Sequence, residues 1–197
     1  MLPIKLGGVL LSAGASRRMG QPKAFLRLDG DTFVARGVGI LKAAACDPVI
    51  VVIAPGTSDN YEAELGDGVQ LVENPAPERG MLSSLAVGLE ALPADVTHAM
   101  VTLVDAPLVR PATAQLLEEH CALVPELILV PTVDGIAGHP VVYPQEHWGR
   151  LAAWQGAEGA RGYLAAHSEE TCQVETGDPG VARDFDSPQD LPPGALS

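Results

Sequence analysis

Residues 10–23 read Leu-Leu-Ser-Ala-Gly-Ala-Ser-Arg-Arg-Met-Gly-Gln-Pro-Lys and follow a short apolar run. This pattern predicts a buried strand that ends in a loop able to hold a phosphate group. Gly14 and Gly20 let the backbone turn where a side chain would collide with a ligand, and Arg17, Arg18 and Lys23 supply positive charge. The spacing matches neither a Walker loop nor a dinucleotide fingerprint. The alternative is a plain strand-to-helix turn, and the clustered charge argues against it.

Length and composition favour a single globular domain. A chain of 197 residues with 47% hydrophobic and 19% charged residues is long enough for one well-packed core. The net charge of −13 repels nucleic acid backbones and anionic membrane surfaces, so neither is expected as a partner. A small phosphorylated substrate is compatible with this charge, because a divalent cation can offset the charges of carboxylates and phosphates.

The three cysteines and the N-terminus indicate a cytoplasmic protein. Cys46, Cys121 and Cys172 are widely spaced and lack the Cys-x-x-Cys pattern of zinc and redox sites, so we expect buried or incidental thiols. The N-terminus has no signal-type apolar region, and the chain has no run of about 18 apolar residues.

Short β-rich segments alternate with helical patterns, which predicts an α/β fold whose mostly parallel sheet is covered by helices on both faces. The expected strands are 8–11, 49–54, 69–72, 98–104 and 127–133, and the expected helices are 31–45, 58–65, 83–92 and 111–123. Beyond residue 138 the pattern is less regular, with a strand to 143 and helices near 145–154 and 160–167. We expect residues 183–188 to return toward the site before a short terminal helix.

Asp105 is the first candidate metal ligand. Ligands of open α/β sheets bind beyond the carboxyl ends of the strands, and Asp105 directly follows an apolar strand. Mg²⁺ prefers oxygen ligands and usually takes one or two carboxylates, the second of which Asp184 or Asp186 offers. The alternative is that Asp105 caps the following helix and that the two late aspartates are turn residues.

Two further segments carry polar groups at strand ends. Residues 74–84 lead into a helix, and Ser83 and Ser84 near its start could bind a base or a phosphate. The alternative role of either serine is the helix N-cap. His139 stands between a glycine and a proline, without nucleophile-elbow geometry, so no covalent mechanism is assigned to it. It either contacts a second substrate or bonds to backbone.

Five motifs occur together in this chain. They are residues 11–23, 80–85 (Gly-Met-Leu-Ser-Ser-Leu), 104–107 (Val-Asp-Ala-Pro), 138–140 (Gly-His-Pro) and 159–162 (Gly-Ala-Arg-Gly). Together they resemble the molybdenum cofactor nucleotidyltransferases, in the order of that family and over nearly the whole chain. The resemblance implies a Rossmann-like, three-layer α/β/α fold. It also implies one domain over 1–197, with a nucleotide-binding half (about 1–123) and an acceptor-binding half (about 124–197).

The resemblance also implies an activity and a set of site residues. A nucleoside triphosphate would bind with Mg²⁺, and its nucleotidyl group would pass to the phosphate of molybdopterin, with release of pyrophosphate and a possible molybdoenzyme as partner. The roles implied are Arg18 and Lys23 on the triphosphate, Asp105 on the metal, Ala13 and Gly14 near the base, Ser83 and Ser84 in the nucleotide pocket, and His139 and Arg161 toward the acceptor.

The resemblance is greatest to the cytidylyltransferase branch. The guanylyl branch typically has a second glycine where Ala13 stands and a Gly-Pro-Leu-Ala-Gly type segment around residues 81–84, so both differences favour CTP. The chain departs from the cytidylyl pattern in the neighbours of Asp105 and in residues 134–137, which replace a basic stretch. The alternatives are a guanylyltransferase, a sugar-phosphate nucleotidyltransferase and a non-catalytic nucleotide-binding chaperone.

Overall fold

An eight-stranded sheet forms the centre of the computed structural model, which describes residues 3–14, 20–185 and 190. The strand order is β10-β7-β9-β6-β1-β4-β5, with β8 paired to β7. The strands are β1 (Leu6–Leu11), β4 (Val49–Ile53), β5 (Gln70–Glu73), β6 (His98–Leu103), β7 (Ile128–Val133), β8 (Ile136–Ala137), β9 (Val141–Pro144) and β10 (Thr171–Glu175). Pairs β5-β4, β4-β1, β1-β6 and β7-β10 are parallel, and β9 is antiparallel to β6 and β7. The predicted mostly parallel sheet is confirmed.

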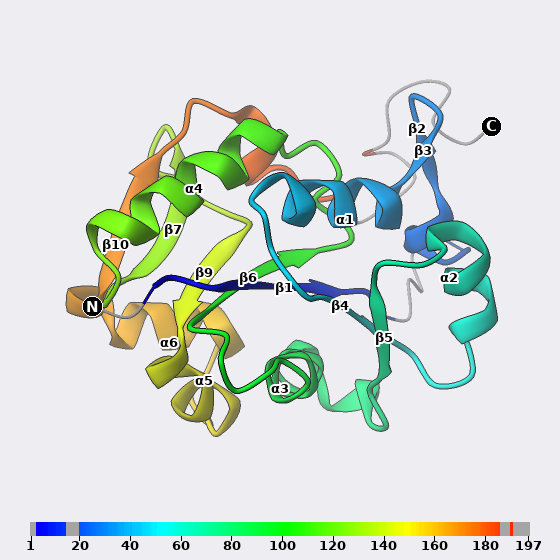
Figure 1. Ribbon diagram of the computed structural model, residues 1–197, viewed down its shortest axis with the longest axis horizontal. Helices are drawn as coiled ribbons and strands as arrows, with labels where there is room; N and C mark the ends of the chain where they lie inside the picture. The colour runs from blue at the N-terminus through cyan, green and yellow to red at the C-terminus, as the bar shows by residue number, and fades with distance from the viewer. Residues whose placement is uncertain (1–2, 15–19, 186–189, 191–197) are drawn as a thin grey trace.

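Helices cover both faces of this sheet (Figure 1). Helices α1 (Phe33–Ala43) and α4 (Pro111–Leu123) lie on one face, and α3 (Met81–Glu90), α5 (Gln145–Ala152) and α6 (Gly159–Ala166) lie on the other. Helix α2 (Ser58–Leu65) flanks the β5 edge. The smaller elements are the hairpin β2 (Arg27–Leu28) and β3 (Asp31–Thr32) and the 3₁₀ turns η1 (Lys23–Phe25), η2 (Pro77–Arg79), η3 (Ser168–Glu170) and η4 (Pro179–Ala182). In the described part of the chain, none of the helices has the length and apolar character needed to span a bilayer.

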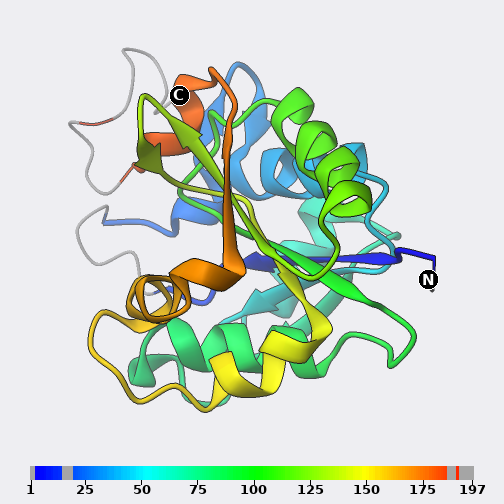
Figure 2. The same cartoon turned by 90° about the vertical axis from the view of Figure 1, so that its left-hand side faces the viewer.

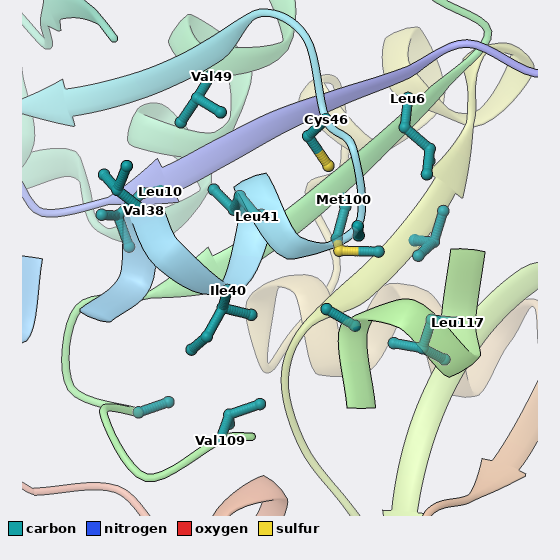
Figure 3. Close-up of a cluster of buried hydrophobic side chains, with 14 of the residues drawn as sticks. Leu6, Leu10, Val38, Ile40, Leu41, Cys46, Val49, Met100, Val109 and Leu117 are labelled. Carbon is teal, nitrogen blue, oxygen red and sulfur yellow. The ribbon is translucent and has the colours of Figure 1, made fainter. Parts of the chain in front are cut away.

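Two hydrophobic clusters, one on each face, hold the layers together. Leu10 and Met100 belong to the cluster under α1 and α4 (Figure 3), whereas their neighbours Val9 and Val101 belong to the cluster under α3, α5 and α6. Successive strand residues point to opposite faces, so β1 and β6 are apolar on both sides, as central parallel strands are. At Gly88 of α3 a Cβ would lie 2.5 Å from Val9 Cγ1, so the glycine allows this helix to approach β1 closely.

The structure differs from the sequence prediction mainly in the short elements. The predicted helices 58–65 and 111–123 are confirmed, but β8, β10 and the β2-β3 hairpin were not predicted. Helix α1 begins at Phe33, because residues 31–32 form β3 and the Thr32 hydroxyl caps the helix by accepting a bond from the Ala35 amide. The terminal helix expected after residue 188 falls on residues that, apart from residue 190, lie outside the description.

Candidate active site

Segments that follow β1 and β6 bring together two charged residues that the sequence singled out. Lys23 Nζ lies 3.1 Å from Asp105 Oδ2. Lys23 opens η1, and Asp105 lies in the turn that follows β6, which the Val104 amide ties to β1 by a bond to the Leu11 carbonyl. The Lys23 side chain is 11% exposed and that of Asp105 is 23% exposed. Such a pair, shielded from bulk water, interacts more strongly than one on the open surface.

The second oxygen of Asp105 remains available. Asp105 Oδ1 is buried and has no hydrogen-bond partner among the described residues. A buried carboxylate oxygen without a partner is costly, so such atoms usually face a ligand, an ion or water. A hard divalent cation, which prefers oxygen ligands, fits this atom.

The alternative role of Asp105 as a helix cap is wrong. Arg110 stands at the N-cap position of α4 and offers no side-chain cap. The acceptor is Asp178, whose Oδ2 receives bonds from the Arg110 amide (2.8 Å) and the Thr113 hydroxyl (2.7 Å). The sequence analysis did not identify Asp178, because a Gly-Asp-Pro stretch is typical of an ordinary turn.

Residues 183–185 return to this site, as predicted. The Phe185 amide donates to the Asp105 carbonyl oxygen over 3.0 Å. The exposed Asp184 is therefore next in sequence to a residue that bonds to the backbone of the candidate metal ligand. Asp186 and Arg18 lie outside the described residues, so their roles stay predictions. The described residues contain no group of three or more His, Cys, Asp or Glu side chains arranged to hold a metal. A cation on Asp105 would therefore take further ligands from elsewhere, such as phosphate and water oxygens.

A hydrogen-bonded polar network follows β5. Asn74 is 1% exposed, and its Nδ2 donates to the hydroxyls of Ser83 and Ser84, both at 2.9 Å. The Ser83 hydroxyl in turn reaches the Gly80 carbonyl oxygen at 2.8 Å. Helix α3 begins at Met81 with Gly80 as its N-cap, so the interpretation of either serine as the N-cap is wrong. Both hydroxyls lie in the first helical turn, where Asn74 fixes their orientation.

The loop after β1 is described as far as Gly14. Ala13 is 4% exposed and packs in the core, while Gly14 is exposed. The Ser12 hydroxyl lies 2.7 Å from the Tyr61 hydroxyl, which anchors the loop to α2. Gly20 has a φ of +70° and so needs glycine, but Gly14 is not among the residues with positive φ. The interpretation that both glycines are needed to turn the backbone is therefore confirmed only for Gly20.

His139 lies within electrostatic reach of Arg161. His139 Nδ1 is buried without a partner in the described part of the chain. Burial lowers the pKa of His139, and the positive charge of Arg161 lowers it further, whereas Asp105 and a backbone hydrogen bond at Val101 act in the opposite direction. The ring is therefore neutral near pH 7 and lies within electrostatic reach of Asp105 and Arg161. Arg161 is exposed in the first turn of α6.

Comparison with known proteins assigns the family. The family model of the MobA-like NTP transferase domain matches residues 8–171. The chain belongs to this family. A probable molybdenum cofactor guanylyltransferase of Synechococcus elongatus is 34% identical over 125 residues, which are 62% of each chain. Another from Opitutus terrae is 32% identical over 143 residues, covering 71% of this chain and 66% of that protein. The chain thus spans 62% of the length of the Synechococcus relative.

Solved structures share the fold of this chain. Rv0371c from Mycobacterium tuberculosis superposes with a TM-score of 0.80 at 26% identity, covering 95% of this chain and 96% of that one. The crystal structure of Rv0371c in complex with manganese gives a TM-score of 0.77 at 26% identity, with 96% of each chain covered. A nucleotidyl transferase from Methanothermobacter has a TM-score of 0.78 at 21% identity over 94% of each chain, a likeness of fold alone.

In this MobA-like chain, Lys23, Asp105, His139 and Arg161 interact as a series of neighbours. Lys23 pairs with Asp105, and His139 lies within electrostatic reach of Asp105 and Arg161. The two cations suit phosphate groups, and the carboxylate suits a divalent metal ion.

Proposed function

We propose that this chain transfers a nucleotidyl group from a nucleoside triphosphate to the phosphate of a molybdopterin-type acceptor, releasing pyrophosphate. The Lys23–Asp105 pair supports this best, because it joins a phosphate-binding cation to a carboxylate with one oxygen left for a metal. The acceptor class follows from the names of the relatives and from the Gly-His-Pro and Gly-Ala-Arg-Gly motifs. A cytoplasmic location, a single functional domain and transfer of the product to a molybdoenzyme belong to the same proposal.

We place GTP first as the donor. The curated relatives of 32–34% identity are named probable molybdenum cofactor guanylyltransferases, which favours GTP over the CTP that the sequence motifs predict. CTP is the second candidate because of one specific observation. Ser83 and Ser84, held by Asn74, stand where the guanylyl branch has its Gly-Pro-Leu-Ala-Gly type segment.

The reaction requires no nucleophile from the protein. An oxygen of the acceptor phosphate attacks the α-phosphorus in line, a new P–O bond forms, and the bond to the β-phosphate breaks with departure of pyrophosphate. The Lys23 ammonium binds the triphosphate and stabilises the charge that develops on the leaving group. Arg161 binds the anionic acceptor, and the neutral His139 ring offers it a hydrogen-bonding nitrogen. Orientation and electrostatics thus supply the catalysis.

A divalent cation fits Asp105 Oδ1, and Asp184 or Asp186 would complete its carboxylate ligands. When bound, such an ion polarises phosphate oxygens and offsets their charge. We propose Mg²⁺ as the physiological ion, and the manganese complex of Rv0371c supports a divalent metal in this family.

The proposal is tested by following the label of an α-³²P nucleoside triphosphate in the presence of Mg²⁺ and a molybdopterin-type acceptor. Transfer of the label to the acceptor supports the proposal. Transfer to a sugar phosphate instead would assign the chain to the sugar-phosphate nucleotidyltransferases. Tight nucleotide binding without transfer to any acceptor would support the non-catalytic chaperone.

A further inference from the structure

We propose that Asp178 is a positioning residue for this site and anchors residues 178–185 as a strap across the loops that carry Asp105, His139 and Lys23. The catalytic part of this inference rests on the proposed function, whereas its structural part does not. Figure 2 shows the strap, in orange to red, beside the β7-β8 hairpin, and contacts of η4 with β7 and β8 agree with this view.

Asp178 is a buried acid whose bonds are directed at the turn that follows β6. It is 2% exposed, and its Oδ2 accepts from the Arg110 amide and the Thr113 hydroxyl. Its Oδ1 accepts from the Gly180 amide at 3.0 Å and lies 3.6 Å from Arg110 Nε. One carboxylate therefore joins the start of α4 to the start of η4, across a sequence separation of 68 residues.

A local residue could have capped α4 more simply. The residues that usually cap helices are Ser, Thr, Asp and Asn in the chain immediately before the helix, but Arg110 occupies that position here. The acid comes instead from the strap. Loss of a local cap would affect α4 alone, whereas loss of Asp178 also releases η4. Asp178 therefore links Arg110, at the end of the segment that follows β6, to the position of the strap.

The strap then passes between two functional loops at backbone contact. A Cβ at Gly180 would lie 2.2 Å from the Leu108 carbonyl oxygen, in the segment that follows β6 and carries Asp105. A Cβ at Gly138 would lie 1.7 Å from the Val181 carbonyl oxygen. No side chain fits at either contact, so the strap determines how far the turn after β6 lies from the Gly-His-Pro loop.

The end of the strap fixes Asp105 and the segment after Lys23. The Phe185 amide donates to the Asp105 carbonyl oxygen. The Phe185 ring is fully buried against Phe33, with ring centroids 5.7 Å apart, in a cluster with Leu26 and Leu28. Lys23 lies three residues before Leu26. A shift of the strap would therefore move the ammonium, the carboxylate and the imidazole relative to one another.

The structural part is tested by amide hydrogen exchange on the full chain. We expect Asp178→Ala to speed exchange of the Val109 and Phe185 amides by about tenfold, because the lost hydrogen bonds make local opening easier. Asp178→Asn should give a smaller increase, because its single carbonyl oxygen still accepts from the Arg110 amide. Thr97→Val, which removes hydrogen bonds at the opposite end of β6, is the matched control and should leave these two amides unchanged.

The positioning role is tested by nucleotidyl transfer with the same variants. We expect Asp178→Ala to lower kcat by up to about a hundredfold with little change in KM for the nucleotide, since misplacement of reacting groups costs rate at unchanged binding. Asp178→Asn should restore part of kcat. If Asp178→Ala folds and exchanges its Val109 and Phe185 amides at the wild-type rate, the strap inference is overturned. A rise in exchange that Thr97→Val reproduces also overturns it. Absence of turnover in the wild type would refute the proposed function, and the exchange results would still decide on the strap.

Discussion

Replacing Lys23 by methionine tests the centre of the site most sharply. The substitution keeps an apolar stem of similar length and removes the ammonium that lies 3.1 Å from Asp105 Oδ2. It therefore removes the Lys23 partner of Asp105 Oδ2, while Asp105 Oδ1 already has no hydrogen-bond partner among the described residues. We therefore expect both turnover and the free energy of unfolding to fall.

The two losses can be estimated separately. Removal of one partner from a buried ion pair costs about 3–5 kcal/mol when the other charge stays dry. The Asp105 side chain is 23% exposed, so hydration offsets part of this cost, and we expect the free energy of unfolding to fall by about 1–3 kcal/mol. Loss of one preorganised group that stabilises developing charge lowers kcat by about a hundredfold or more.

Lys5→Met is the matched control. Lys5 Nζ lies 2.7 Å from Asp95 Oδ2, a shorter pair than that of Lys23, but the two side chains are 42% and 69% exposed. Pairs that open to solvent contribute little, so this variant should keep wild-type stability and turnover. The assays are urea unfolding and pyrophosphate release. A folded Lys23→Met variant with the kcat of Lys5→Met would refute the role of Lys23.

Three further predictions concern the metal ligand, the thiols and the strap contact. Asp105→Asn should weaken Mn²⁺ binding, measured by electron paramagnetic resonance, and lower kcat by about a hundredfold, because the amide is a weaker ligand for a hard cation. Burial raises the pKa of the Cys46 and Cys121 thiols to about 12, so at about pH 8 iodoacetamide should modify Cys172 alone, as counted by mass spectrometry. Gly138→Ala should lower the free energy of unfolding by about 1–3 kcal/mol or more, because its Cβ overlaps the backbone of η4.

Each of these predictions has an outcome that would contradict it. Unchanged Mn²⁺ affinity in Asp105→Asn would remove that carboxylate from the metal site. Alkylation of Cys46 or Cys121 at the rate of Cys172 in the folded chain would show that these two thiols are accessible to solvent, contrary to the structure. Modification of all three cysteines in urea is the control. Wild-type stability of Gly138→Ala, with Gly149→Ala as a control at a glycine whose Cβ would meet no described atom within 4 Å, would refute the close contact with the strap.

The elements that the sequence predicted well are those with local signals. Helices 58–65 and 111–123 match the structure because a serine or proline marks each start and helical patterning fills the rest. Strand β10 was missed because Thr-Cys-Gln-Val-Glu lies at the sheet edge and carries few apolar residues. The strand after Gly-His-Pro was expected, but its antiparallel direction depends on the neighbours β6 and β7, which local patterns do not reveal.

The same distinction holds for the site. The proximity of Lys23 to Asp105 follows from the rule that parallel strands bring their carboxyl ends to one edge, so the sequence could predict it. The cap supplied by Asp178 could not be predicted, because its partners lie 65 and 68 residues away and a buried acid in a turn has no local signature. The bonds from Asn74 to both serines also depend on the distance between β5 and α3, which packing sets.

The central claim is tested most directly by pyrophosphate release with a molybdopterin-type acceptor and Mg²⁺, comparing GTP, CTP, ATP and UTP at equal concentration. The account predicts release that depends on the acceptor and is fastest with GTP. Faster release with CTP would keep the transferase and reverse the assignment of its nucleotide. Absence of acceptor-dependent release with all four nucleotides, from a folded and metal-loaded protein, would contradict the account.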